Sequence, residues 1–467
     1  MHFKLFPAET YKKRREVLRS GISGGPILLM GNEESGMNYR DNTYPFRQDS
    51  TFLYYFGLDV AGLAAVIDPE SGAEILFGNE LTMDQIIWTG PLPSLREMAA
   101  AAGITTVEPF DALPGWLKKA GALHTVHYLP PYRELNQMRL AEWFGIPVAQ
   151  VPDKVSVPLI EAVVRQRAIK EAIEATAIEE AVSISVDMHH AAMKHVKPGM
   201  KEHELAAKVL EVAHAAGGRL SYNVICTIEG QVLHNHYYGN TIRNGDLVLL
   251  DAGAEQVMHY AGDLTRTFPA GGKFTNQQRE VYDVVLNSLE RAAGQLHPGK
   301  RFIDIHALAC EALLQGLKEI GLFMGDPAEG VQEGAHTLFF QCGLGHMMGL
   351  DVHDMEDLGE QYVGYSPQLA KRKDFGWKYL RLGRELEAGY VLTVEPGIYI
   401  IPELIDRWKA ENKLAGMINY PLLEKYRHFT GIRIENNYLI TATGSRLFGK
   451  PLATTAAEVE AMVQTRY

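Results

Sequence analysis

The sequence predicts two domains: an α/β domain over residues 1–157, followed by a larger α+β domain over residues 158–467. Three observations lead to this prediction. A chain of 467 residues exceeds what one hydrophobic core usually serves, and 46% hydrophobic residues are ample for two cores. The first part alternates helix-like and strand-like segments. The second part opens with long helical patterns and continues with short apolar strands.

The expected α/β domain begins with a helix in YKKRREVLRSG, which has helical periodicity. Short apolar runs that end at glycine or proline-type breakers follow it, and we interpret them as strands: PILLMG, TFLYYFGL, LAAVIDP and AEILFG. The segment QVPDKVSVP contains Pro152 and Pro158 and has little apolar periodicity. We therefore place the junction between the two domains there.

The second domain is expected to begin with a long helical stretch from Leu159, which Pro198 and Gly199 bring to an end. Two further helices are predicted in TNQQREVYDVVLNSLERAAGQL and IDIHALACEALLQGLKEIGL. Short strands lie between or after them, in DLVLLDAG, VLTVEPGIYI and GIRIENNYLIT. Long helices combined with short strands indicate an α+β arrangement.

Composition excludes several classes of partner. The formal charge of −12, from 57 acidic and 45 basic residues, argues against nucleic acid and anionic membranes, which both require clustered basic surface. No apolar run reaches 18 residues, and the N-terminus lacks the apolar core of a signal peptide. The three cysteines are far apart and form no CxxC pair, which indicates neither a disulfide framework nor a structural zinc module. We therefore expect a cytoplasmic protein.

Four acids stand inside or at the ends of the apolar strands, where an ionised carboxylate needs compensation. Asp251 closes LVLLD, and Asp263 follows twelve residues later, so two antiparallel strands could place both carboxylates side by side. Glu395 precedes Pro396, whose ring holds the glutamate extended. In GIRIEN, strand alternation puts Arg433 on the same face as Glu435.

The stretch GLGHMMGLDVHD sets His346 and His353 seven residues apart. Its three glycines each weaken a helix by about 1 kcal/mol, so a bent loop or strand junction is expected, and the two histidines can serve different purposes. His346 could supply a nitrogen ligand to a metal. The alternative is that both are ordinary surface histidines.

The four acids carry a formal charge of −4, which two divalent cations would cancel, and this arithmetic predicts a dinuclear site. Oxygen-dominated ligation favours Mn²⁺, while Co²⁺, Zn²⁺ and Fe²⁺ also remain open. The alternative interpretation is four acids in unrelated salt bridges or turns.

Taken together, DLVLLDAG, AGDLTRTFP, GLGHMMGLDVHD, LEAGYVLTVEPGIYI and GIRIEN resemble the pita-bread metallopeptidases, most closely the aminopeptidase P and prolidase branch. NYRDNTYPFRQDSTFLYYFGL resembles the N-terminal domain of aminopeptidase P, so the resemblance covers nearly the whole chain. It implies a pita-bread (creatinase/aminopeptidase) catalytic domain with five metal ligands. These are Asp251, Asp263, His346, Glu395 and Glu435, with Asp263 and Glu435 bridging or chelating the ions.

The resemblance also implies roles in metal-assisted hydrolysis. Glu395 would carry the proton from water to the leaving nitrogen, and His353 would stabilise the tetrahedral intermediate. Arg433 would orient a ligand or the substrate. Matching the distance back from Asp251 selects His234 as the substrate-side histidine, with His236 as the alternative.

Two residues bear on specificity and assembly. Cys342 stands four residues before His346, where relatives commonly carry histidine, which leaves the proline pocket open to question. Trp88 in IIWTGP is either a core aromatic or, by the resemblance, lines the substrate cleft of a neighbouring subunit. A homo-oligomer, dimer or tetramer, is expected.

Three functions follow as hypotheses. The first is an Xaa-Pro aminopeptidase, acting on peptides with proline in the second position. The second is an Xaa-Pro dipeptidase (prolidase). The third belongs to another class, a pita-bread module that has lost catalysis and binds peptides or a partner protein. Occupation of all five ligand positions argues against the third, because buried acids that face one another are costly without a function.

Overall fold

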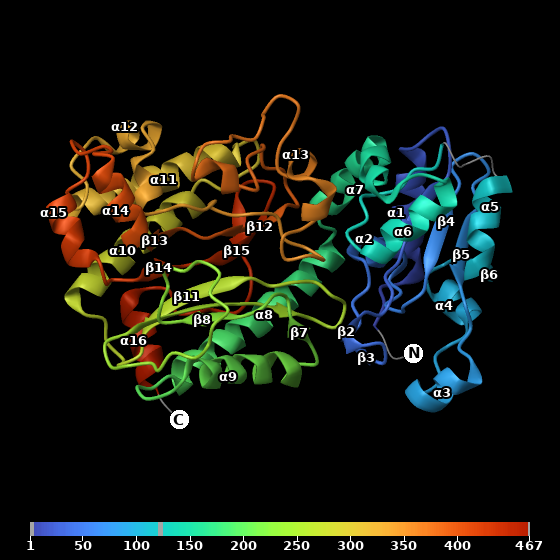
Figure 1. Ribbon diagram of the computed structural model, residues 1–467, viewed down its shortest axis with the longest axis horizontal. Helices are drawn as coiled ribbons and strands as arrows, with labels where there is room; N and C mark the ends of the chain where they lie inside the picture. Colours follow the sequence, from blue (N-terminus) through green and yellow to red (C-terminus); the bar gives the residue numbers. More distant parts are fainter. Residues whose placement is uncertain (1–3, 120–124, 466–467) are drawn as a thin grey trace. The chain divides into compact units, whose positions relative to one another are not determined.

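The computed structural model describes residues 4–119 and 125–465, which form two compact units. Unit 1 comprises Met1–Arg167 with Met355–Tyr362, and unit 2 comprises Ala168–Asp354 with Val363–Tyr467. Figure 1 labels the elements of both, and each unit is described by itself.

Unit 1 is built on a four-stranded sheet with the order β1-β4-β5-β6. Its strands are β1 (Ile27–Met30), β4 (Ala64–Ile67), β5 (Glu74–Gly78) and β6 (Thr106–Pro109). The β5–β6 pair is parallel and the other two pairs are antiparallel. A hairpin of β2 (Gly36–Tyr39) and β3 (Asn42–Thr43) forms a separate sheet. The helices are α1 (Ala8–Ser20), α2 (Ser50–Phe56), α3 (Met83–Thr89), α4 (Leu95–Ala101), α5 (Leu113–Lys119), α6 (Glu134–Phe144) and α7 (Val157–Ala168).

One expected strand of this unit is wrong, because TFLYYF lies in helix α2. The Asp49 carboxylate accepts a hydrogen bond from the Phe52 N–H at 2.8 Å, which caps the N-terminus of the helix. Gly57, with φ 68°, ends it in the left-handed conformation. All seven residues of α2 are buried, so the sequence lacks the polar face that reveals a surface helix.

The long helix expected from Leu159 is in fact two helices. The helical stretch predicted from Leu159 is interrupted, because α7 ends at Ala168 and α8 (Ala172–His195) begins after a short break. In the break, the Lys170 N–H donates to the Gly389 carbonyl at 2.9 Å. The Lys170 ammonium pairs with the buried Asp354 carboxylate at 2.8 Å. These partners hold Lys170 out of a continuous helix.

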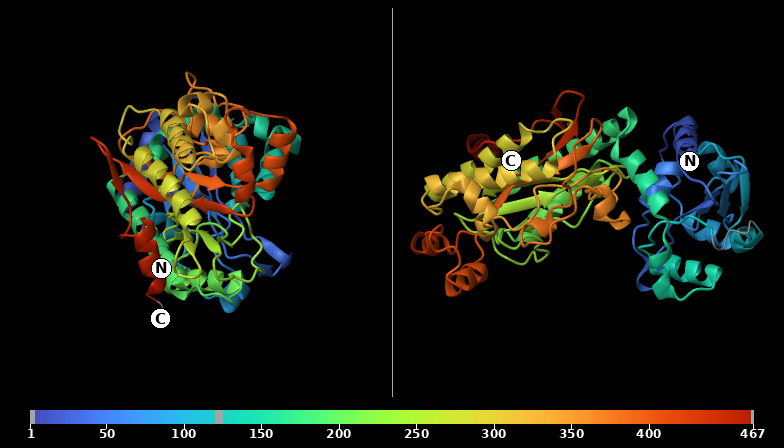
Figure 2. Two further views of the ribbon diagram at one scale, coloured as in Figure 1. Left: turned by 90° about the vertical axis from the view of Figure 1, so that its left-hand side faces the viewer. Right: turned by 90° about the horizontal axis from the view of Figure 1, so that it is seen from above.

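Three further long helices are α9 (Glu202–Ala215), α10 (Asn276–Ala293) and α11 (Phe302–Glu319). The short ones are α12 (Pro327–Gln332), α14 (Pro402–Ala410), α15 (Tyr420–Leu423) and α16 (Ala456–Gln464), whereas α13 (Glu360–Val363) begins in the Met355–Tyr362 segment of unit 1. Helix α8 packs on α9, and α10 lies beside α11, as Figure 2 shows from two further directions. Within residues 4–119 and 125–465, no helix combines the length and apolar character needed to cross a bilayer.

The strands of unit 2 are antiparallel. A sheet of order β11-β9-β8 contains β8 (Ile225–Thr227), β9 (Leu247–Ala252) and β11 (Leu264–Pro269). A second sheet, β12-β15-β16, contains β12 (Val391–Val394), β15 (Asn436–Ile440) and β16 (Ser445–Leu447). Strands β13 (Gly397–Tyr399) and β14 (Gly431–Arg433) pair with each other, and β10 (Ala254–Glu255) pairs with β7 (Arg219–Leu220).

Isolated bridges connect these pieces. Thr265 of β11 pairs with Glu435, between β14 and β15, and Met347 pairs with Leu392 of β12. Helix α8 packs on β9 and β11, whereas α10 packs on β12, β13 and β14. The bridges therefore bring the segments around Asp263, His346, Glu395 and Glu435 to one place.

Candidate metal centre

The two aspartates meet as the strand pairing predicts. Asp251 lies on β9 opposite Thr265 of β11, and Asp263 immediately precedes β11. A single hydroxyl joins them: the Tyr222 oxygen lies 2.6 Å from Asp251 Oδ1 and 2.5 Å from Asp263 Oδ1. Both aspartates are buried. Two carboxylates therefore face one point, as the sequence predicted.

His346 enters from the glycine-containing loop, which is not helical, as expected. A side-chain carbon added to Gly345 would lie 2.1 Å from the Thr393 carbonyl oxygen, so the glycine allows the loop to lie against β12. The Thr393 N–H donates to the His346 carbonyl at 3.0 Å. Gly345 thus serves close packing of backbone on backbone.

The His346 ring is oriented for ligation. Its Nδ1 lies 3.0 Å from the Met347 carbonyl and donates to it, so Nε2 is the ring nitrogen that can ligate a metal. Nε2 lies 3.3 Å from Asp263 Oδ2 and 3.5 Å from Glu395 Oε1.

The two glutamates come from neighbouring strands of unit 2. Glu395 follows β12, and its N–H donates to the Leu344 carbonyl at 2.8 Å. Glu435 interrupts the strand that GIRIENNYLIT predicted, since β14 ends at Arg433 and β15 starts at Asn436. Its N–H donates to the Thr265 carbonyl at 3.0 Å, and Oε2 accepts from the Thr265 hydroxyl at 2.7 Å.

Two observations show that these residues are suited to bind divalent cations. Ligand atoms of Asp263, His346 and Glu435 all lie within 4.8 Å of one another. The second oxygen of Glu435, Oε1, is buried and has no hydrogen-bond partner. A buried acceptor without a donor is costly, and a cation would satisfy it.

The raised pKa values of the acids also favour cation binding. Burial, reinforced by the charge of Asp251, raises the pKa of Asp263 to about 7. Burial raises the pKa of Glu395 to about 7 as well. Burial and the charges of Asp263 and Glu395 raise the pKa of Glu435 well above its usual range. Carboxylates this close cannot all ionise without cations between them.

Arg433 is held by three protein partners. Its Nη2 lies 2.5 Å from Asp251 Oδ2, Nη1 donates to the Tyr399 hydroxyl at 2.8 Å, and Nε donates to the Thr265 hydroxyl at 3.1 Å. Arg433 and Glu435 both contact the Thr265 hydroxyl, at 3.1 Å and 2.7 Å, so the two side chains point the same way, as strand alternation predicted. The sequence left two roles open for Arg433, to orient a metal ligand or to orient the substrate. Its contact with Asp251 favours the first role.

A cavity of about 950 Å³ in unit 2 opens onto these residues. His353 lines it, and its ring centre lies 4.2 Å from that of His346. His234 and His236 both line it, and burial together with the charge of Arg433 lowers the pKa of His234. The structure therefore places all the residues singled out from the motifs at one cavity. Trp88 belongs to unit 1, where it is 86% exposed on α3, which argues against its being a core aromatic.

Sequence reasoning missed the hydroxyl partners of this site, Tyr222 and Thr265 among them. Thr265 could have been found, because it stands on β11 directly opposite Asp251 and two positions after Asp263. Tyr222 stands in a loop after β7, and nothing local indicates that its hydroxyl reaches two distant acids.

Comparisons with known proteins identify the family of this chain. Residues 176–442 match metallopeptidase family M24, and residues 11–127 match the aminopeptidase P N-terminal domain. The chain belongs to metallopeptidase family M24, in the arrangement in which an aminopeptidase P N-terminal domain precedes a pita-bread catalytic domain. It is a metallopeptidase.

Among similar proteins, human Xaa-Pro dipeptidase is 34% identical over 94% of this chain and 88% of its own length. A probable Xaa-Pro aminopeptidase of Sordaria macrospora is 32% identical over 94% of this chain and 92% of its own. A solved structure of Escherichia coli aminopeptidase P matches with a TM-score of 0.82 at 29% identity, covering 99% of both chains. Aminopeptidase PepP of Pseudomonas aeruginosa matches with a TM-score of 0.81 at 26% identity, covering 98% of both.

Proposed function

We propose that this protein hydrolyses the peptide bond before a proline in the second position of a peptide, using two divalent cations, and so releases the N-terminal residue. The observation that carries the proposal is the convergence of buried ligand atoms on one cavity: those of Asp263, His346 and Glu435 lie within 4.8 Å of one another. The names of the relatives support the Xaa-Pro bond as the target.

The ligand set proposed for the cations is Asp251, Asp263, His346, Glu395 and Glu435. Four carboxylates and one imidazole favour hard to borderline ions, and we propose Mn²⁺ as the native metal. Zn²⁺ remains compatible, since a zinc-substituted form of Escherichia coli aminopeptidase P has been solved. When bound, the two cations lower the pKa of water and polarise the carbonyl of the scissile bond.

The chain itself would move the proton and hold the substrate. Glu395 lines the cavity with its side chain 20% exposed, and its carboxylate would carry the proton to the leaving nitrogen of proline. His353 and His234, on the cavity wall, would donate hydrogen bonds to the oxygen on which negative charge develops. Arg433 would hold Asp251 in place.

The proline ring needs an apolar wall, and the cavity provides Phe375, Tyr379, Leu404 and Ile401. Cys342 lines the same cavity, and burial raises the pKa of its thiol to about 12, so it is neutral. Where relatives commonly carry a histidine, this chain would thus present a small uncharged group near the proline ring. We propose that the cavity accepts bulkier substrate groups beside Cys342.

A dipeptidase is the second candidate, and the human Xaa-Pro dipeptidase among the relatives favours it. The cavity volume of about 950 Å³ favours the aminopeptidase, because it lies at the upper end of ligand pockets and leaves room beyond the proline. Comparing kcat/KM on Gly-Pro and on a tripeptide with proline second tests this. We expect the tripeptide to be cleaved faster, and cleavage of Gly-Pro alone would establish the dipeptidase.

We further propose that the protein works in the cytoplasm as a homo-oligomer. Three free cysteines, Cys226, Cys310 and Cys342, suit a reducing compartment. The exposed apolar residues of α3, Met83, Ile87 and Trp88, suit an interface between subunits. Sedimentation of the Trp88→Ala variant tests the interface, and an unchanged oligomer size would remove Trp88 from it.

A further inference from the structure

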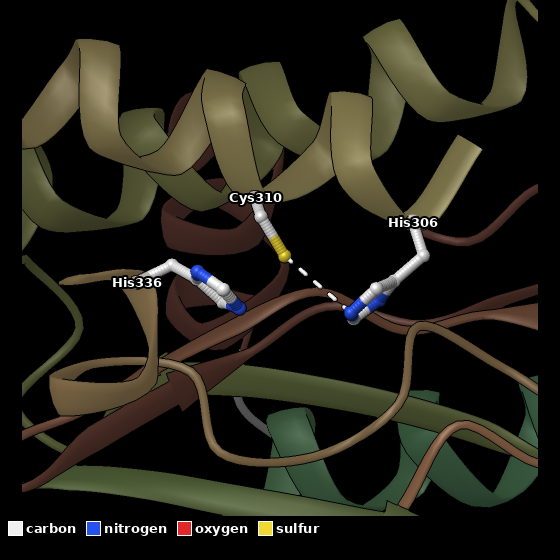
Figure 3. Close-up of side chains that lie close together, drawn as sticks. All are labelled: His306, Cys310 and His336. Carbon is white, nitrogen blue, oxygen red and sulfur yellow. Dashed lines mark hydrogen bonds between the residues drawn. The ribbon is translucent and has the colours of Figure 1, made fainter. Parts of the chain in front are cut away.

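A second cluster of metal-ligating side chains lies inside unit 2. His306 and Cys310 stand one helical turn apart on α11, and His336 faces them from the short helix η5 (Ala335–Leu338), as Figure 3 shows. All three are at most 1% exposed. None of them lines the catalytic cavity. The cluster is therefore not part of the site already described.

Its geometry matches metal coordination. The Cys310 sulfur lies 3.6 Å from His306 Nε2, and ligand atoms of all three residues lie within 4.8 Å of one another. A tetrahedral ion with metal–sulfur and metal–nitrogen distances of about 2.3 Å and about 2.05 Å would hold these two atoms about 3.6 Å apart. His306 and Cys310 on α11 already have that separation. His336 adds the third ligand.

Three of the four imidazole nitrogens have no hydrogen-bond partner. These are His336 Nδ1, His336 Nε2 and His306 Nδ1, and all three are buried. Burying a polar atom without a partner is unfavourable. Burial lowers the pKa of His306 to about 3 and that of His336 to about 4, so both rings are neutral at physiological pH. Neutral rings keep a lone pair available for a cation.

The surroundings are apolar and carry a positive charge at their edge. The Trp377 ring lies 4.8 Å from the His306 ring and 5.8 Å from the His336 ring, both edge-on. The Arg372 guanidinium stacks on Trp377 at 4.0 Å and contributes to lowering the pKa of both histidines. This environment disfavours added net charge, so a cation must be compensated by a negative ligand.

We propose that Cys310, His306 and His336 form a second metal site, which binds one soft or borderline cation through a thiolate and two imidazoles. Binding forms one metal–sulfur and two metal–nitrogen bonds and releases the thiol proton of Cys310 to solvent. Cu⁺ leaves the net charge of the pocket unchanged, whereas Zn²⁺ raises it by one. Both suit this ligand set. The site does not depend on the Xaa-Pro activity.

X-ray absorption of the full-length protein tests the site, because no cysteine belongs to the catalytic ligand set. The catalytic centre is first filled with Mn²⁺, and one equivalent of Zn²⁺, or of Cu⁺ under anaerobic reductant, is then added and measured at its own edge. We expect a sulfur neighbour at about 2.3 Å in at least one arm, and that arm identifies the cation. Only nitrogen and oxygen neighbours in both arms would overturn the proposal.

Matched variants locate the sulfur. Cys310→Ser should lose the sulfur neighbour, whereas Cys226→Ser, equally buried on β8, should retain it. A sulfur neighbour that persists in Cys310→Ser, or that disappears in Cys342→Ser, would overturn the assignment. His336→Leu keeps all three cysteines and should bind the cation at least tenfold more weakly, which covers the case in which Cys310→Ser fails to fold.

Discussion

At the scale of single residues, the proposed catalytic centre depends on how its acids are held. Each carboxylate has at least one fixed protein partner: Tyr222 for Asp251 and Asp263, Thr265 for Glu435 and Thr393 for Glu395. Partners of this kind orient metal ligands and tune their basicity. The function of each acid can therefore be tested separately from that of its partner.

Glu395→Gln removes the proposed proton carrier and keeps the size of the side chain. Loss of a positioned general acid–base typically costs about 10²–10⁴-fold, so kcat on an Xaa-Pro peptide should fall at least a hundredfold. Glu403→Gln, at another carboxylate on the cavity wall, should change kcat little. Wild-type turnover by Glu395→Gln would remove Glu395 from the mechanism.

Tyr222→Phe removes the one hydroxyl that bonds to both aspartates. Changes at such partners usually weaken metal affinity about 10–100-fold, and we expect Mn²⁺ binding by calorimetry to weaken within that range. Tyr282→Phe is the control, since its buried hydroxyl donates to the Thr454 carbonyl instead. Equal Mn²⁺ affinities of the wild type, Tyr222→Phe and Tyr282→Phe would show that Tyr222 does not support metal binding.

At the scale of elements, the site depends on backbone contacts between segments far apart in the sequence. Asp251, Asp263 and Glu395 could be placed from sequence because strand alternation, pairing and the following proline have local rules. The partner Tyr222 and the helix α2 could not. The first depends on a long-range contact, and the second is buried on all sides, so periodicity gives no signal there. The interruption at Glu435 could not be predicted either, because Glu435 bridges there to Thr265, 170 positions earlier in the sequence.

Gly345→Ala tests the contact between the His346 loop and β12. The added carbon would overlap the Thr393 carbonyl oxygen, so the loop must move away from the strand. Overpacking of this kind costs about 1–3 kcal/mol, and the shift of His346 should also reduce bound metal. Thermal melting and metal analysis measure both effects.

Gly416→Ala provides the comparison, because a carbon added at Gly416 meets no atom within 4 Å. We expect this variant to melt and to bind metal like the wild type. If Gly345→Ala did the same, the loop would not need its close approach to β12.

At the scale of the whole molecule, the cations should stabilise the fold. Buried acids with raised pKa values favour the protonated folded state, and this contribution to stability is lost as pH rises through the folded-state pKa. Asp263 and Glu395, whose pKa values are raised to about 7, act in this direction. Bound cations replace the lost protons.

The contribution of these two acids to the melting temperature of the metal-free protein should therefore fall between about pH 5 and about pH 8, because the unfolded acids titrate near pH 4. The buried His306 and His336, whose pKa values are lowered, act in the opposite direction below about pH 6.5, and equally in the metal-free and the Mn²⁺-loaded protein. Adding Mn²⁺ should raise the melting temperature, and by more at the higher pH. Differential scanning calorimetry of chelated and Mn²⁺-loaded samples measures this. A gain that is the same at both pH values would contradict the assignment of these acids to the metal.

The bridge between Thr265 and Glu435 spans 170 positions, and it has a consequence for biosynthesis. Asp251 and Asp263 are synthesised long before Glu435, so the proposed ligand set is incomplete during most of translation. Ion selection is thus postponed until the final strands dock. The ion acquired should then reflect the free-ion pool in which folding finishes, and expression in manganese-rich or zinc-rich medium should yield correspondingly different contents.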